Sequence, residues 1–138
     1  MFQGNVERLL AAYELVNERF ADLKAGDLDS FLEFFATDVV IDMVDAPDAD
    51  TYVGHDGVRQ WFDAVYGPWD AVHVEATGFI QAGDWTVAQL DCTLRGEASG
   101  VELELPITAV HQFRSGRIAR DRLYLDRADA LASVGLSE

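Results

Sequence analysis

The second half of the chain is the feature that most restricts its fold. From Trp69 to Asp126, apolar and polar residues alternate with a period of two, which is typical of strands that bury one face. Short polar and glycine-containing segments divide this region at QAGD, RGEASG and RSG. Connections of this length join neighbouring antiparallel strands. The sequence therefore predicts an antiparallel meander of four long strands.

The first half has helical periodicity instead. Residues 5–23 carry apolar side chains at spacings of three and four, which is typical of a helix with one buried face. Gly26 is expected to end this helix, and Asp27 or Asp29 to cap a second short helix rich in phenylalanine and leucine. We therefore expect two helices before the first strand.

The segments between these helices and the meander are short. Residues 38–44 are rich in β-branched side chains and predict a strand, and residues 45–54 predict a polar loop. Asp56 can begin a third helix that Gly67 and Pro68 end, and residues 126–136 suggest a closing helix. The expected fold is α+β, with three N-terminal helices packed on one face of a curved, mostly antiparallel sheet. A chain of 138 residues predicts a single domain over residues 1–138.

Composition excludes several classes of partner. The chain has 25 acidic and 10 basic residues and a net charge of −15, so we expect neither nucleic acid nor an anionic membrane as a partner. No segment approaches the roughly 18 apolar residues of a membrane span. The single Cys92 and the absence of a recognisable leader predict a cytoplasmic protein. Three scattered histidines give no metal-ligand spacing, and no glycine-rich phosphate loop is present, so we expect no metal and no cofactor.

The order of these elements resembles the SnoaL-like, or nuclear transport factor 2-like, superfamily. The segments that carry the resemblance are AGDLDSFLEFFATDVVIDM, YVGHDGVRQWF, IQAGDWTV and FRSGRIARDRLYLDRADAL. The resemblance implies a cone-shaped half-barrel that encloses an apolar pocket, and frequent homodimers. It also implies one of several activities: ketosteroid isomerase, epoxide hydrolase, dehydratase or polyketide cyclase. Other members of the superfamily have the pocket and catalyse no reaction. The fold therefore does not settle the function.

Most catalytic residues of ketosteroid isomerases and of limonene-epoxide hydrolases are replaced in this sequence. Comparison with ketosteroid isomerases puts Met43 at the position of the catalytic base, and Arg19 and Ala109 at the positions of the oxyanion-binding residues. Comparison with limonene-epoxide hydrolases keeps only Asp91 of the third-strand motif and puts Leu123 at the last-strand aspartate. SnoaL-type cyclases use a histidine and an aspartate on the late strands, a pattern that His111 and Asp121 loosely match.

The last hairpin predicts which residues face the pocket. If RSG forms a three-residue loop with Gly116 in the left-handed region, Phe113 opposes Arg117, His111 opposes Ala119 and Ala109 opposes Asp121. Opposed residues share a face, so His111 and Asp121 become diagonal neighbours on an apolar face. The outer face would carry Glu102, Glu104, Thr108, Gln112, Arg120, Arg122, Tyr124 and Asp126.

An acid beside an imidazole in an apolar cavity has a chemical use. The carboxylate fixes the tautomer of the imidazole, which then serves as a general base or acid near neutral pH. We therefore take His111 and Asp121 as candidate catalytic residues. The alternative is that the two residues form a structural pair that contacts no ligand. Candidate ligand-binding residues are Tyr13, Asp42, Met43, Trp61, Phe113 and Leu123.

Three further polar residues are weaker candidates for the pocket. His55 is expected to be solvated at the start of the third helix, and alternation places His73 and Asp91 on the outer face. A register inversion would bring His73 inside.

Three roles stay open on the sequence alone. The first is a cofactor-free isomerase, cyclase, dehydratase or hydrolase that acts on a small apolar molecule. The second is a non-catalytic module that binds such a ligand. The third is a dimeric accessory domain whose own side chains fill the pocket. A preformed cavity with convergent polar groups would favour the first two.

Overall fold

Six strands and four helices make up the part of the fold that the structure describes. The computed structural model describes residues 2–45, 50–96 and 100–137. The helices are α1 (Phe2–Lys24), α2 (Asp29–Leu32), α3 (Gly54–Tyr66) and α4 (Arg127–Ser133). The strands are β1 (Phe35–Met43), β2 (Thr51–Val53), β3 (Ala71–Ala82), β4 (Trp85–Gly96), β5 (Val101–Arg114) and β6 (Arg117–Tyr124). They form one sheet in the order β2-β1-β6-β5-β4-β3, in which only β1 and β6 run parallel.

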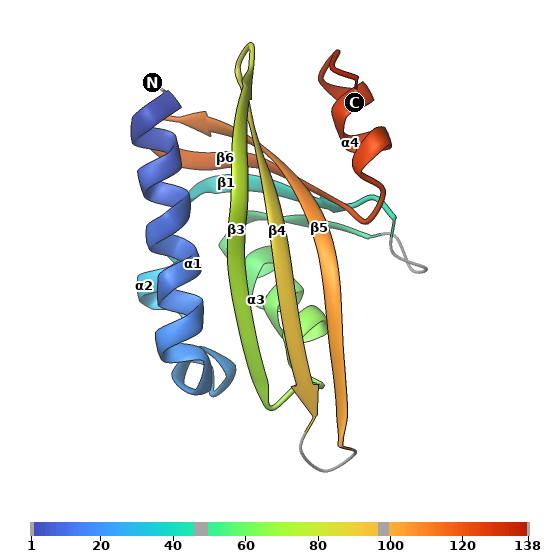
Figure 1. Cartoon of the computed structure of the whole chain (residues 1–138). Helices are drawn as coiled ribbons and strands as arrows, with labels where there is room; N and C mark the ends of the chain where they lie inside the picture. The colour runs from blue at the N-terminus through green and yellow to red at the C-terminus, as the bar shows by residue number, and fades with distance from the viewer. Residues whose placement is uncertain (1, 46–49, 97–99, 138) are drawn as a thin grey trace.

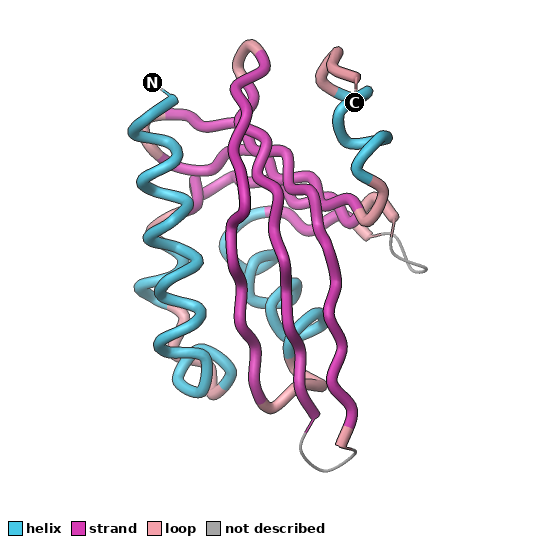
Figure 2. Tube along the Cα trace, viewed as in Figure 1, coloured by secondary structure: helices cyan, strands magenta, loops and turns pink. Residues whose placement is uncertain are grey.

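The sheet bends around the helices. The long strands β3, β4 and β5 run across the shorter β1, β2 and β6, and α1 lies along the β3 side of the molecule (Figure 1). α1 packs on β3 and α3 packs on β1, so the two helices and the concave face of the sheet enclose the main apolar core. The continuous strands and the twist of the sheet are visible in Figure 2. The predicted α+β cone with its meander is confirmed. No helix in the described part of the chain is long and apolar enough to cross a membrane.

The periodicity of α1 explains why it lies where it does. Its buried residues recur every three or four positions and form one stripe toward the sheet: Leu9, Ala12, Val16, Phe20 and Leu23. Leu10, which was expected on this stripe, is exposed. Gly26 ends the helix as predicted, with a φ of 106° that favours glycine.

Some boundaries differ from those predicted. Thr51–Val53, expected within a loop, form β2 and pair antiparallel with β1, while residues 46–49 of that loop lie outside the described residues. α2 has Leu28 at its N-cap and no side-chain cap, so neither Asp27 nor Asp29 caps it. α3 begins two residues before Asp56, at Gly54.

The predicted register of the last hairpin is wrong by two residues. The loop contains only Ser115 and Gly116, both with positive φ (53° and 77°), as a tight two-residue hairpin turn requires. Arg114 therefore pairs with Arg117, and Phe113 pairs with Ile118. The shorter turn alone would have moved every side chain of β6 to the other face.

A β-bulge at Ala119 restores the original face. The ladder passes from the pair Phe113–Ile118 to the pair Gln112–Arg120, so Ala119 has no partner across the ladder. The turn and the bulge each shift the register by one residue. His111 and Asp121 thus still share the concave face, but they are directly opposed rather than diagonal. Ala119, expected on the pocket face, is replaced there by Ile118.

A second apolar cluster lies on the opposite face of the sheet. The closing helix α4, capped by the Asp126 side chain, places Ala130 and Leu131 against the sheet residues Val87, Val110 and Tyr124. Part of the outer face is therefore covered by the chain's own C-terminal segment.

Candidate active site in the apolar cavity

The cone encloses a cavity of about 230 Å³. Its walls come from α1, α3, the strands β4 and β5, and the ends of β1 and β6, and most of the lining side chains are aliphatic or aromatic. The few polar lining groups include Tyr13, Tyr66, Cys92, His111 and Asp121. A preformed, mostly apolar cavity with a few polar groups is the usual form of a small-molecule site.

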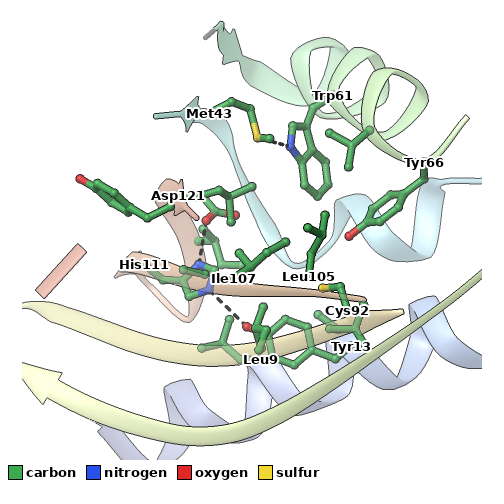
Figure 3. Close-up of a pocket in the computed structure, with 18 of the residues that line it drawn as sticks. Leu9, Tyr13, Met43, Trp61, Tyr66, Cys92, Leu105, Ile107, His111 and Asp121 are labelled. Atoms are coloured by element: carbon green, nitrogen blue, oxygen red, sulfur yellow. Dashed lines mark hydrogen bonds and ion pairs between the residues drawn. The ribbon is translucent and has the colours of Figure 1, made fainter. Parts of the chain in front are cut away.

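Three of these polar groups form a connected set on one side of the cavity. The Tyr13 hydroxyl lies 3.3 Å from Nε2 of His111, and Nδ1 of His111 lies 3.2 Å from Oδ1 of Asp121 (Figure 3). α1 supplies the tyrosine, β5 the histidine and β6 the aspartate. His111 and Asp121 are only 3% and 4% exposed, so water does not screen their interaction. We call these three residues the polar triad.

The contact between His111 and Asp121 is close but poorly directed. Although Nδ1 and Oδ1 are within ion-pair distance, neither atom has a hydrogen bond of good geometry to any described residue. Buried polar atoms without such partners are few in native proteins. A buried donor and a buried acceptor without well-placed partners cost free energy unless another group satisfies them.

Tyr13 can act as the hydrogen-bond donor in its contact with His111. Burial, and after it the charge of Asp121, raise the pKa of Tyr13 well above its ordinary value, so the phenol keeps its proton. Its O–H can then donate to Nε2 of His111. This leaves the ring proton on Nδ1, where it faces the Asp121 carboxylate rather than presenting a lone pair to it.

Three other predicted ligand-binding residues also line the cavity. Met43 ends β1, Trp61 lies on α3, and Leu123 lies on β6. The indole N–H of Trp61 points at the Met43 sulfur, 3.2 Å away, which orients both side chains. Four of the six predicted ligand-binding residues, Tyr13 among them, therefore line the cavity together with His111 and Asp121.

Two predicted ligand-binding residues do not line the cavity. Asp42 precedes Met43 in the same strand, so its side chain points to the opposite face, where it accepts a hydrogen bond from Thr51 at 2.7 Å and approaches Arg122 at 3.9 Å. Phe113 lies beyond the triad toward the hairpin turn, where it packs on the edge of the main core. Ile118, its partner across the ladder, takes the lining position.

The remaining candidates lie outside the cavity. His73 and Asp91 are exposed, in agreement with the alternation of their strands. His55 contacts the backbone carbonyl of Phe35, 3.0 Å from its Nε2, and belongs to a surface depression. Among the described residues, no three His, Cys, Asp or Glu side chains are grouped in a way that could hold a metal ion.

Sequence reasoning missed Tyr66 and Asp45 as lining residues. Tyr66 follows Phe62 by four positions on α3, a spacing that could have placed it on the buried face. Burial raises its pKa, with smaller contributions from Cys92 and Asp121. Burial, followed by the charge of Asp91, also raises the pKa of Cys92 to about 11, so this lining thiol is not a thiolate near neutral pH. Asp45 follows the β1 strand at a point where no local pattern gives its direction.

Solved structures show the same fold. TerC, co-crystallised with polyporic acid, is 20% identical, with a TM-score of 0.72 over 95% of this chain and 97% of that one. An NTF2-like protein of unknown function from Burkholderia pseudomallei is 21% identical, with a TM-score of 0.72 over 96% and 98%. SalBIII, an epoxide hydrolase/cyclase-like enzyme with a role in pyran ring formation in salinomycin, is 20% identical, with a TM-score of 0.71 over 92% and 94%. No curated protein sequence matches the chain.

At these identities the structures establish the fold and not the reaction. The sequence profile of the SnoaL-like domain matches residues 16–121, which is more than half of the chain and includes both His111 and Asp121. The protein therefore belongs to the SnoaL-like family and has the NTF2-like fold.

Proposed function

We propose that this protein is a cofactor-independent acid–base enzyme that acts on a small, mostly apolar molecule. The observation that carries the proposal is the buried polar triad at the wall of an otherwise apolar cavity. Two proteins that share the fold have small-molecule associations: TerC was co-crystallised with polyporic acid, and SalBIII has a role in pyran ring formation in the polyether salinomycin.

The geometry assigns a role to each member of the triad. When a ligand oxygen replaces Nε2 as the acceptor of the Tyr13 O–H, the phenol polarises that oxygen and Nε2 becomes free. Nε2 of His111 can then take a proton from a carbon next to a carbonyl, or from a water that attacks an epoxide. Asp121, 3.2 Å from Nδ1, stabilises the imidazolium until the proton returns to the product.

The apolar walls support the same chemistry in another way. They keep water from competing for the triad, which strengthens its electrostatic interactions with a polarised ligand. A volume of about 230 Å³ corresponds to roughly eight water molecules at about 30 Å³ each, so a ligand of on the order of ten non-hydrogen atoms would fill it.

Proton exchange tests this function without knowledge of the natural substrate. α-Tetralone is a bicyclic ketone of suitable size, and NMR in D₂O measures exchange of the hydrogens next to its carbonyl. We expect the protein to accelerate this exchange, and His111→Ala and Asp121→Asn to reduce the acceleration by about 100-fold or more. Tyr13→Phe should reduce it as well.

The control is Asp91→Asn, which changes an exposed carboxylate on the outer face. Circular dichroism should show that each variant is folded. Exchange no faster than in buffer, or exchange unaffected by His111→Ala, would contradict the proposal and favour a binding module without chemistry.

A further inference from the structure

Tyr66 places a second polar group across the cavity from the triad. It is the last residue of α3, and its hydroxyl is turned toward Leu105 and the interior, on the side of the cavity opposite His111 (Figure 3). The side chains between these two polar groups are mostly apolar, and they include Leu105 and Ile107 of β5. The cavity therefore has a polar group well away from the triad.

Neighbouring aromatic rings hold Tyr66 in position. Its ring lies 5.6 Å from the Trp61 ring and 6.1 Å from the Phe20 ring in edge-on contacts, and 4.9 Å from the Phe62 ring. Such contacts favour one ring orientation. The hydroxyl group is thus directed by packing on α1 and α3 and not by a polar partner.

The hydroxyl of Tyr66 has no hydrogen bond to any residue in the described part of the chain, in contrast to Tyr13, which contacts His111. Since burial raises the pKa of Tyr66, the group remains a phenol and a hydrogen-bond donor. The Tyr66 side chain is only partly buried, so its hydroxyl stays accessible and can donate to a ligand or to a water molecule.

The charges of the lining residues restrict which ligand groups could accept a hydrogen bond from Tyr66. Among the described residues, no lysine or arginine lines the cavity, while Asp45 and Asp121 both do. A carboxylate or phosphate in this cavity would lose its hydration without gaining a cation, and it would face two acidic residues. A neutral oxygen, such as a carbonyl, ether or hydroxyl group, has no such cost.

We propose that Tyr66 is a specificity-determining residue that donates a hydrogen bond to a second oxygen of the ligand. The ligand is then a neutral molecule with an apolar body and oxygen acceptors at both ends. One oxygen is bound by the triad and the other by Tyr66. This inference rests on the proposed function, because it takes the triad as the place where the reacting oxygen binds.

A pair of ketones that differ in one oxygen tests the inference. α-Tetralone has a single carbonyl, and 6-hydroxy-α-tetralone adds a hydroxyl at the far end of the same skeleton. Isothermal titration calorimetry gives the dissociation constant of each. We expect wild-type protein to bind the hydroxylated ketone more tightly, and Tyr66→Phe to weaken this binding by about threefold to tenfold while leaving α-tetralone unchanged.

The matched control is Tyr52→Phe, which removes a hydroxyl from a tyrosine of β2 that does not line the cavity. It should change neither dissociation constant. The anion 5,6,7,8-tetrahydro-2-naphthoate, of similar size, should bind at least ten times more weakly than the hydroxylated ketone.

Each contrary result has a distinct meaning. Equal effects of Tyr66→Phe on both ketones, no effect on either, tight binding of the naphthoate, or no binding of any oxygenated probe would overturn the role of Tyr66. Failure of the proposed function would appear separately, as selective loss of affinity in Tyr66→Phe together with no catalysed hydrogen exchange in wild-type protein.

Discussion

Removing both members of the buried His111–Asp121 pair should cost less stability than the sum of the losses from removing each one alone. The pair is almost fully buried, with Nδ1 and Oδ1 3.2 Å apart. His111→Phe leaves the Asp121 carboxylate in the core without a partner, and breaking a buried pair in this way costs about 3–5 kcal/mol. Asp121→Leu leaves a neutral imidazole that still contacts Tyr13, so we expect a smaller loss of about 1–3 kcal/mol.

The double variant His111→Phe/Asp121→Leu separates interaction from packing. It replaces both groups with apolar side chains and leaves no buried charge, so its loss should be at least about 2 kcal/mol smaller than the sum of the single losses. The effect is easily measured, because a domain of this size has a total stability of about 5–15 kcal/mol.

Urea unfolding at pH 7, followed by tryptophan fluorescence and by circular dichroism, gives these free energies if the m-values of the variants agree. The exposed pair Arg95–Glu102, with 3.0 Å between its charged atoms, serves as the reference cycle and should show a coupling below about 1 kcal/mol. Additivity within about 0.5 kcal/mol at His111 and Asp121 would refute the view that the two groups depend on each other in the core.

Three further predictions concern the cavity and α3. Because burial raises the pKa of Cys92 to about 11, its alkylation by iodoacetamide at pH 8 should be on the order of 100-fold slower in folded than in urea-unfolded protein; equal rates would contradict burial. Tyr13 and Tyr66 have raised pKa values in the folded state, so above about pH 10 the unfolded chain binds fewer protons than the folded protein, and the free energy of unfolding falls as pH rises. Tm measured from pH 9 to 11.5 should therefore decline, and it should decline less steeply in Tyr13→Phe. Gly57→Ala would place a Cβ 2.9 Å from the backbone carbonyl carbon of Tyr52 and should lower the free energy of unfolding in urea by about 1–3 kcal/mol. An unchanged midpoint would show that β2 moves aside with no loss of stability.

The architecture could be predicted because it depends on patterns that extend over many residues. A period of two sustained from Trp69 to Asp126, with three short interruptions, leaves little choice but a meander. The helices follow from spacings of three and four in the same way. β2 has only three residues and pairs at the edge of the sheet, so no periodicity could reveal it.

The register of the last hairpin shows where sequence patterns are insufficient. Ser115-Gly116 fits a two-residue turn as well as it fits part of a three-residue loop, and nothing in the sequence marks Ala119 as the bulged residue. The predicted face of His111 and Asp121 was nevertheless right, because the alternation of apolar residues records which face is buried. The direct opposition of the two residues required the structure.

Some of the candidate ligand-binding residues line the cavity and others do not, and strand geometry explains one such difference. Asp42 and Met43 were both expected in the cavity, yet neighbours in a strand point to opposite faces, so only one of them could line it. Tyr66 was missed because its hydroxyl is directed by rings from other elements, a tertiary effect that helix periodicity does not describe.

The end of the β5–β6 ladder, next to the cavity, has a consequence for how the sequence of this protein can vary. The β5–β6 ladder ends at the pair Thr108–Tyr124, and Pro106, two residues before Thr108, has no N–H to extend it. The Asp45 carboxylate takes over by accepting from the backbone N–H groups of Leu125 and Asp126, at 2.9 and 3.0 Å. Both Asp45 and the half-exposed Leu125 line the cavity. Part of the cavity lining thus lies outside the ladder, so point substitutions there can alter the lining while the sheet that carries the triad keeps its pairing.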